Sequence, residues 1–137
     1  MRAFFGIVVF LAATAIFSRV TAYEPGADVT TRYGVIKAGR NPSSDRPDHL
    51  IWNGEKLLEL EDGYVAVKQV FQMSDYDVAL ISQNAGGSLS VSSYSFLIVK
   101  PNEKFEILTN DEMHSDDGTV EVSHQGNSIS INFGYSR

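Results

Sequence analysis

Short segments separated by turn residues are the feature that most constrains the fold of this 137-residue chain. Asn53-Gly54 and Gln125-Gly126-Asn127 combine residues that tolerate a positive φ, and each lies between two segments rich in apolar residues. No segment after residue 22 keeps a helical apolar period over several turns. Turn residues instead recur about every 8–12 positions. We therefore expect an all-β domain, an antiparallel sandwich, barrel or meander of about nine strands.

The alternation of apolar and polar residues also predicts where the strands lie and which residues share a face. In residues 64–73, strict alternation places the odd-numbered residues, from Val65 to Met73, on one face. In residues 128–133, it places Ile129 and Ile131 together on the apolar face. The expected strands are residues 32–37, 49–52, 55–60, 64–73, 76–83, 92–99, 105–108, 119–123 and 128–133.

A separate segment, residues 1–22, precedes these strands and has the features of a signal peptide in the right order. Arg2 supplies a positive charge, residues 4–17 form an apolar run, and Val20-Thr21-Ala22 offers short residues to a signal peptidase. The run is shorter than the roughly 20 residues that span a bilayer. We expect cleavage after residue 22, a single all-β domain at 23–137, and a periplasmic location, with secretion as the second choice.

The charge of residues 23–137 favours some partners and excludes others. Arg2 and Arg19 lie in the leader, so the remaining residues carry 9 basic and 17 acidic side chains, a net charge of −8. An acidic surface repels nucleic acid and anionic lipid and attracts basic proteins. The same charge is equally consistent with a role in solubility alone.

Missing residue types and motifs exclude several functions. The chain has no cysteine, which excludes a lipid anchor on a cysteine after the leader, a thiol nucleophile and a thiolate zinc site. It contains no GxSxG or SxxK motif and no phosphate-binding glycine loop. We therefore expect a protein that is not an enzyme, uses no metal or cofactor, and is not membrane-anchored after cleavage.

Three groups of titratable residues offer alternatives to this expectation. His49, His114 and His124 have neither metal-binding nor triad spacing, so we expect them on the surface or in loops. Residues 111–118 form an acidic run without the EF-hand register, which favours a solvated hairpin connection over a cation site. The three acidic residues in 59–62 are expected to form a polar rim rather than a glycosidase pair.

Residues 84–95 form a glycine-hinged, hydroxyl-rich loop that is long for a hairpin turn. Loops of this kind on a rigid sheet often hold binding residues, although a flexible connector explains the composition equally well. We expect this loop to enter a partner's active site while the acidic run steers a basic partner towards it. The expected partner-binding residues are Ser88, Ser90, Ser92, Ser93, Tyr94, Asp111, Glu112, Asp116 and Asp117.

Four short segments of the chain form a recurring pattern. They are Asp77-Val78-Ala79-Leu80-Ile81, Gly86-Gly87 and Tyr94-Ser95-Phe96, after an upstream Trp52-Asn53-Gly54-Glu55. This pattern resembles a group of small exported proteobacterial proteins and covers about the last 90 residues. Many members have a cysteine a few residues after the glycine pair, where this chain has Ser90. The resemblance implies a fold and a compartment rather than an activity.

The exported, acidic, cysteine-free profile is also similar to that of periplasmic immunity proteins, which protect bacteria from peptidoglycan amidases delivered by type VI secretion. This similarity implies a protein partner, a basic cell-wall hydrolase, whose active site the chain occludes. The alternative is a structural or glycan-binding envelope protein that grips glycan through Trp52, Tyr64 and Tyr94. A third interpretation is a hydrolase whose residues meet only in the fold.

Overall fold

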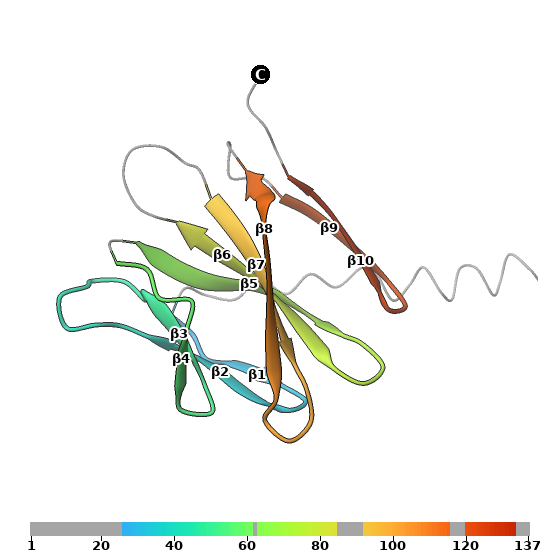
Figure 1. Cartoon of the computed structure of the whole chain (residues 1–137), viewed down its shortest axis with the longest axis horizontal. Helices are drawn as coiled ribbons and strands as arrows, with labels where there is room; N and C mark the ends of the chain where they lie inside the picture. Colours follow the sequence, from blue (N-terminus) through green and yellow to red (C-terminus); the bar gives the residue numbers. More distant parts are fainter. Residues whose placement is uncertain (1–25, 62, 85–91, 116–119, 134–137) are drawn as a thin grey trace, which may run out of the picture.

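The computed structural model describes residues 26–61, 63–84, 92–115 and 120–133, so the expected signal peptide lies outside the described residues. In the described part of the chain there is no helix, and hence none long and apolar enough to span a membrane. The strands form three antiparallel layers of open sheets (Figure 1), which confirms the all-β prediction and excludes the closed barrel. The ten strands of these residues are β1 (Val29–Thr31), β2 (Gly34–Gly39), β3 (His49–Trp52), β4 (Glu55–Leu57), β5 (Tyr64–Gln72), β6 (Asp77–Asn84), β7 (Ser92–Val99), β8 (Phe105–Ser115), β9 (Val120–Gln125) and β10 (Ser128–Phe133).

Sheet A, the first layer, contains β1 to β4 in chain order. The strand predicted at 32–37 is confirmed for residues 34–37, which lie in β2, but residues 32–33 form a turn that follows an additional strand, β1. In this turn the Thr31 hydroxyl donates a hydrogen bond to the Gly34 carbonyl (2.8 Å) and accepts one from the Tyr33 amide (3.1 Å). The side chain of Thr31 thereby adds two hydrogen bonds within the turn.

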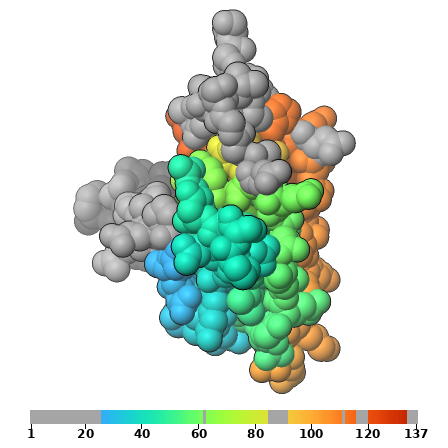
Figure 2. Space-filling view, turned by 90° about the vertical axis from the view of Figure 1, so that its left-hand side faces the viewer, coloured from blue at the N-terminus to red at the C-terminus, as the bar shows by residue number. Residues whose placement is uncertain are grey.

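Sheet B, the second layer, contains β5 to β8 in chain order and packs one face against sheet A. Ile36 and Leu50 of sheet A and Ile81 and Leu97 of sheet B are each no more than 1% exposed. In Figure 2 the blue-to-teal segments of sheet A lie in front, and the orange β8 runs along the side. This sandwich is the main hydrophobic core of the described residues.

An ion pair joins the β1–β2 turn of sheet A to sheet B. The carboxylate of Asp77, which is fully buried, accepts hydrogen bonds from the main-chain amide and Nε of Arg32, each 2.8 Å long. The same guanidinium donates to the carbonyls of Met73 and Tyr76 in the β5–β6 turn. A buried carboxylate is stable only with such charged partners, so this pair fixes how the two sheets align.

A bulge in β5 changes which face its residues occupy. Val67 pairs with Ile81 and Gln69 pairs with Leu80, so Lys68 is an extra residue without a partner across the ladder. Before the bulge, odd-numbered residues face sheet A; after it, Phe71 and Met73 face the opposite side. The prediction that the odd-numbered residues from Val65 to Met73 share one face is therefore wrong, because a bulge shifts the alternation by one position.

The hairpin β9–β10 forms the third layer and covers part of the second face of sheet B (Figure 1). Its apolar side packs on a cluster that includes Leu80 and Tyr94. The hairpin residues in this contact, Ile129 and Ile131 among them, are only half-buried. At the hairpin tip, the side chain of Asn127 accepts a hydrogen bond from the Ser74 amide (3.2 Å).

Candidate functional site

Some of the predicted partner-binding residues lie outside the described part of the chain, and the others lie on two strands of sheet B. Ser88, Ser90, Asp116 and Asp117 lie outside the described residues. The others lie on β7 and β8 of sheet B, where Asp111 is described by its main chain alone. The described members of the predicted site are Ser92, Ser93, Tyr94 and Glu112, together with the main chain of Asp111.

The structure brings together two segments that the sequence suggested separately. β6 and β7, the two central strands of sheet B, flank residues 85–91, so the predicted loop leaves from the middle of the sheet. Ser92 pairs with Ser115 and Ser93 pairs with His114, which places the end of the acidic strand β8 beside the base of the loop. We call the described residues at this end of the sheet, 92–93 and 110–115, the loop-base site.

Residues 111–115 of the acidic run belong to a strand rather than to the predicted solvated hairpin connection, and residues 116–118 lie outside the described residues. β8 continues to Ser115 because its pairing with β7 resumes at His114 after an irregularity. Residues 110–113 lie opposite Tyr94 alone, and the Asn110 side chain accepts a hydrogen bond from the Glu112 amide (2.9 Å). Bulges on edge strands redirect side chains and are common next to functional sites. This one exposes Glu112 at the edge of sheet B.

Tyr94 lies inside the fold and not on the surface of the loop-base site. It is 3% exposed, and its ring centroid lies 5.3 Å from that of Phe133. The prediction that Tyr94 contacts a partner is therefore corrected: alternation along β7 turns its ring under the β9–β10 hairpin. Ser93, one position earlier, is exposed.

The residues expected to grip glycan do not form a common surface. Trp52 is 2% exposed in the core between sheets A and B, whereas Tyr94 belongs to the cluster on the other side of sheet B. Tyr64 is half-buried beneath the guanidinium of Arg46, 5.0 Å from its ring centroid. A platform for stacking a sugar needs exposed ring faces, which Trp52 and Tyr94 lack.

His49 was expected on the surface but is buried, with 5% exposure. Its Nδ1 lies 2.6 Å from Oδ1 of Asp48, which is itself 1% exposed. The imidazole lies against Gly39 on the neighbouring strand, where any side-chain Cβ would meet the ring at 2.1 Å. The missing side chain of Gly39 is therefore the local reason that His49 fits into sheet A.

Asp48 and His49 belong to a polar cluster with Glu59, and their environment keeps both acids ionised. Burial acts to raise the pKa of Asp48, but hydrogen bonds from His49 and from the main-chain amide of Asn41 outweigh it and lower the pKa. Hydrogen bonds from the side chains of Asn41 and Lys56 lower the pKa of Glu59. Both carboxylates are therefore charged at neutral pH.

The residue types of this cluster are those of a metal site or of a catalytic triad. Its contacts fit neither of these sites well. Single ligand atoms of Asp48, His49 and Glu59 lie within 4.8 Å of one another, as in a metal site. However, Lys56 Nζ lies 3.0 Å from Glu59 Oε2 and already supplies the positive charge. Within the described ranges no hydroxyl group is hydrogen-bonded to the ring of His49, as a catalytic triad requires.

The main-chain contacts of the cluster indicate a structural role. The Asp48 amide donates to the Gly39 carbonyl (3.0 Å), and the Asp48 carbonyl accepts from the Leu60 amide (2.8 Å). Asp48 thereby fastens the segment before β3 to the segment after β4. Sequence reasoning missed this cluster, because Asn41 and Glu59 reach Asp48 and His49 only through the pairing of three strands.

Comparisons with known proteins found no similar protein from which a function follows. No protein-family model matches the chain, and neither a curated protein nor a solved structure matches it. Among the described residues, the loop-base site is where the predicted binding residues are concentrated.

Proposed function

We propose that this chain is a non-enzymatic binding protein of the periplasm that neutralises a peptidoglycan-degrading amidase by occluding its active site. In this proposal the loop predicted at residues 84–95, of which 85–91 lie outside the described residues, enters the cleft of the amidase, as expected for an immunity protein against type VI secretion. The acidic end of β8 attracts the basic surface around that cleft. Secretion to the cell exterior is the second choice of compartment.

The observation that carries this proposal is the pairing of Ser92 and Ser93 with Ser115 and His114. It puts the described base of the loop beside the described end of the acidic strand, at one end of sheet B, and so supports contact of both with one partner. A loop that leaves two paired central strands has a rigid base, which lowers the entropy lost on binding.

Charge complementarity supports the same partner class. The net charge of −8 in residues 23–137 favours encounter with a basic protein. The bulge at 110–113 presents exposed Glu112 at the sheet edge, next to the loop. Acidic side chains beside an inserting loop raise the association rate more than they slow dissociation.

The test measures inhibition of a purified type VI secretion amidase on isolated peptidoglycan as this chain is added. We expect inhibition to be complete at one chain per amidase. Glu112→Lys should weaken binding about tenfold, chiefly through a slower association that depends on salt. The matched control is Glu106→Lys, the same charge change on the same strand at its other end, which should leave binding unchanged.

Two results would contradict the proposal. One is the absence of a complex with any such amidase at micromolar concentrations. The other is an equal loss of binding in Glu112→Lys and Glu106→Lys, which would show a general charge effect without a loop-base site. Recovery of glycan alone from periplasmic extracts would favour the envelope-protein alternative.

A further inference from the structure

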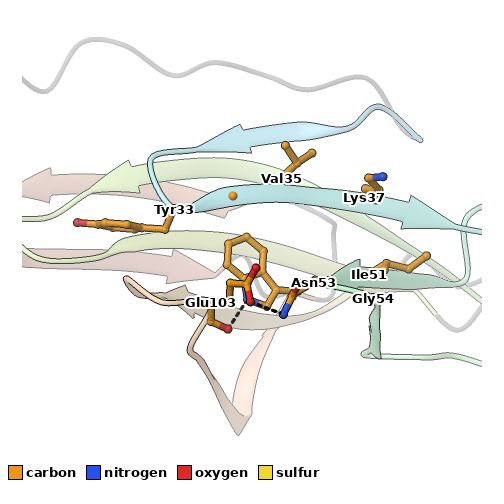
Figure 3. A pocket seen from close by; sticks show the side chains of 9 residues that line it. Tyr33, Val35, Lys37, Ile51, Asn53, Gly54 and Glu103 are labelled. Carbon is orange, nitrogen blue, oxygen red and sulfur yellow. Dashed lines mark hydrogen bonds between the residues drawn. The ribbon is translucent and has the colours of Figure 1, made fainter.

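A cavity of about 410 Å³ lies at the opposite end of the fold from the loop-base site, against the turn between β7 and β8. Its volume is within the range of small-molecule binding sites. Figure 3 shows the residues that surround it, from the β1–β2 turn, β2, β3, the β3–β4 turn and the β7–β8 turn. The residues that matter here are Val35, Lys37, Ile51, Asn53 and Glu103.

The strand register explains how apolar and cationic groups meet in this cavity. Lys37 pairs with Ile51 across the ladder, so their side chains share the outer face of sheet A with Val35. The residues between them, Ile36 and Trp52, are turned into the core. Val35 is 38% exposed, one of the two large apolar side chains exposed among the described residues. The floor of the cavity is therefore apolar with one ammonium group.

Glu103 forms the acidic wall, in a backbone conformation that needs outside support. Its φ is +63, and Asn102 before it also has a φ of +63. This left-handed region suits asparagine but is unfavourable for glutamate. Two hydrogen bonds from sheet A hold it, from Trp52 Nε1 to the Glu103 carbonyl (3.0 Å) and from Asn53 Nδ2 to Oε2 (2.9 Å). Positive φ at two consecutive residues is also what the β7–β8 hairpin turn requires, and the two hydrogen bonds fix where Glu103 lies on the cavity wall.

The charges of Lys37 and Glu103 face the cavity without neutralising partners. Four ion pairs occur in the described part of the chain, and neither residue belongs to any of them. In Figure 3 Lys37 lies on β2 towards one end of the lining, and Glu103 lies below β2, nearer the middle and beside Asn53. The cavity therefore offers one cation, one anion and apolar groups. These complement a molecule that carries an anionic group, a cationic group and an apolar part.

We propose that this cavity binds a short peptide with free termini. The α-carboxylate pairs with Lys37, the α-ammonium pairs with Glu103, and an apolar side chain contacts Val35 and Ile51. This site lies on different strands from the loop-base site, so the inference does not depend on the proposed inhibition of an amidase.

The test titrates the purified full chain with Leu-Leu by calorimetry, alongside acetyl-Leu-Leu and Leu-Leu-amide. We expect Leu-Leu to bind with a millimolar or lower dissociation constant, and each blocked peptide to bind about tenfold more weakly. In Glu103→Gln the acetyl group should make no further difference, because the N-terminal pair is already lost. In Lys37→Met the amide should make no further difference for the corresponding reason.

The variants are chosen to preserve the fold. Glutamine at 103 can still accept the hydrogen bond of Asn53, and methionine at 37 keeps an apolar stem on the sheet surface. Matched controls are Lys100→Met and Glu106→Gln, which alter an exposed ion pair that does not line the cavity. These controls should bind Leu-Leu like the unaltered chain.

Three results would overturn the proposal. They are no binding of Leu-Leu at about 10 mM, equal binding of free and blocked peptides, or binding of an N-acetylglucosamine trimer in place of the dipeptide. The last result would assign the cavity to saccharides. Inhibition of the amidase would be unaffected by any of them, so the two proposals fail separately.

Discussion

The two faces of sheet B are covered in different ways. Towards sheet A, side chains of both layers are fully buried, such as Leu50 from one sheet and Leu97 from the other. Towards the β9–β10 hairpin, central sheet residues such as Leu80 are buried, but the hairpin residues that cover them, such as Ile129 and Ile131, remain half-exposed. The difference indicates that the sandwich supplies most of the stability, while the hairpin is a cover with a lower cost of opening.

The largest effect on stability is expected from a substitution that creates a cavity in the sandwich. Leu97→Ala should lower the free energy of unfolding by about 3 kcal/mol, because Leu97 has no exposed surface and its removal leaves a void between two packed sheets. Ile131→Ala in the hairpin should cost about 1 kcal/mol, since water already reaches that residue. Urea denaturation measures both, and equal losses would contradict the comparison.

A second substitution adds volume to sheet A instead of removing it. Gly39→Ala should cost about 2 kcal/mol, because the new Cβ would lie 2.1 Å from Nε2 of His49. A double-mutant cycle with His49→Ala checks the cause. With the ring absent, Gly39→Ala should become nearly neutral, and a simple sum of the two losses would show that the clash is not with His49.

Asp48, which lies beside β3 of sheet A, should also make the free energy of unfolding depend on pH. The pKa of Asp48 is lower in the folded chain than its ordinary value, so its contribution is fully present above that ordinary value and is lost as pH falls towards the lowered one. The free energy of unfolding should therefore decrease on acidification below about pH 4. Asp48→Asn should reduce this slope in urea titrations at several pH values; an unchanged slope would contradict the assignment.

The smallest expected effect concerns the hairpin tip. Asn127→Ala removes two side-chain hydrogen bonds to Ser74, each 3.2 Å long and exposed. The global free energy of unfolding should fall by about 0.5 kcal/mol. Hydrogen exchange should accelerate most in β9 and β10, and in β6 and β7 by no more than the roughly twofold change that the global loss implies. The control is Asn132→Ala, the same change at an exposed position of the same hairpin; acceleration in both variants would contradict a specific role of the tip.

Sequence patterns predicted those elements whose determinants are local. The bounds of β7 and β10 agree with the prediction, since alternation and the Gly126-Asn127 turn specify them within a few residues. Strand β1 and the turn at residues 32–33 were missed because this turn depends on hydrogen bonds of the Thr31 side chain. The extension of β8 was missed because its last residues pair with β7 only beyond a bulge.

The candidate site was predictable only in part, for the same reason. Composition identified a hydroxyl-rich loop and an acidic segment, but strand pairing alone makes Ser92 and Ser115 neighbours. Burial was the main error: Tyr94 and His49 are polar-tipped side chains whose exposure depends on what packs over them. The acidic wall of the cavity was not suggested by the sequence, because Trp52 and Glu103 meet across sheets.

Because β5 contains an extra residue at its bulge, it has one residue more than it needs to pair with β6. Lys68 has no partner opposite it. A chain lacking Lys68 would therefore keep Val67 facing sheet A and Phe71 facing the hairpin, as a strand with regular alternation. We infer that the chain can lose a residue at this position while the side chains of β5 keep facing the same two hydrophobic clusters. An insertion elsewhere in β5 would send polar side chains such as Gln72 towards the hairpin and Phe71 towards sheet A.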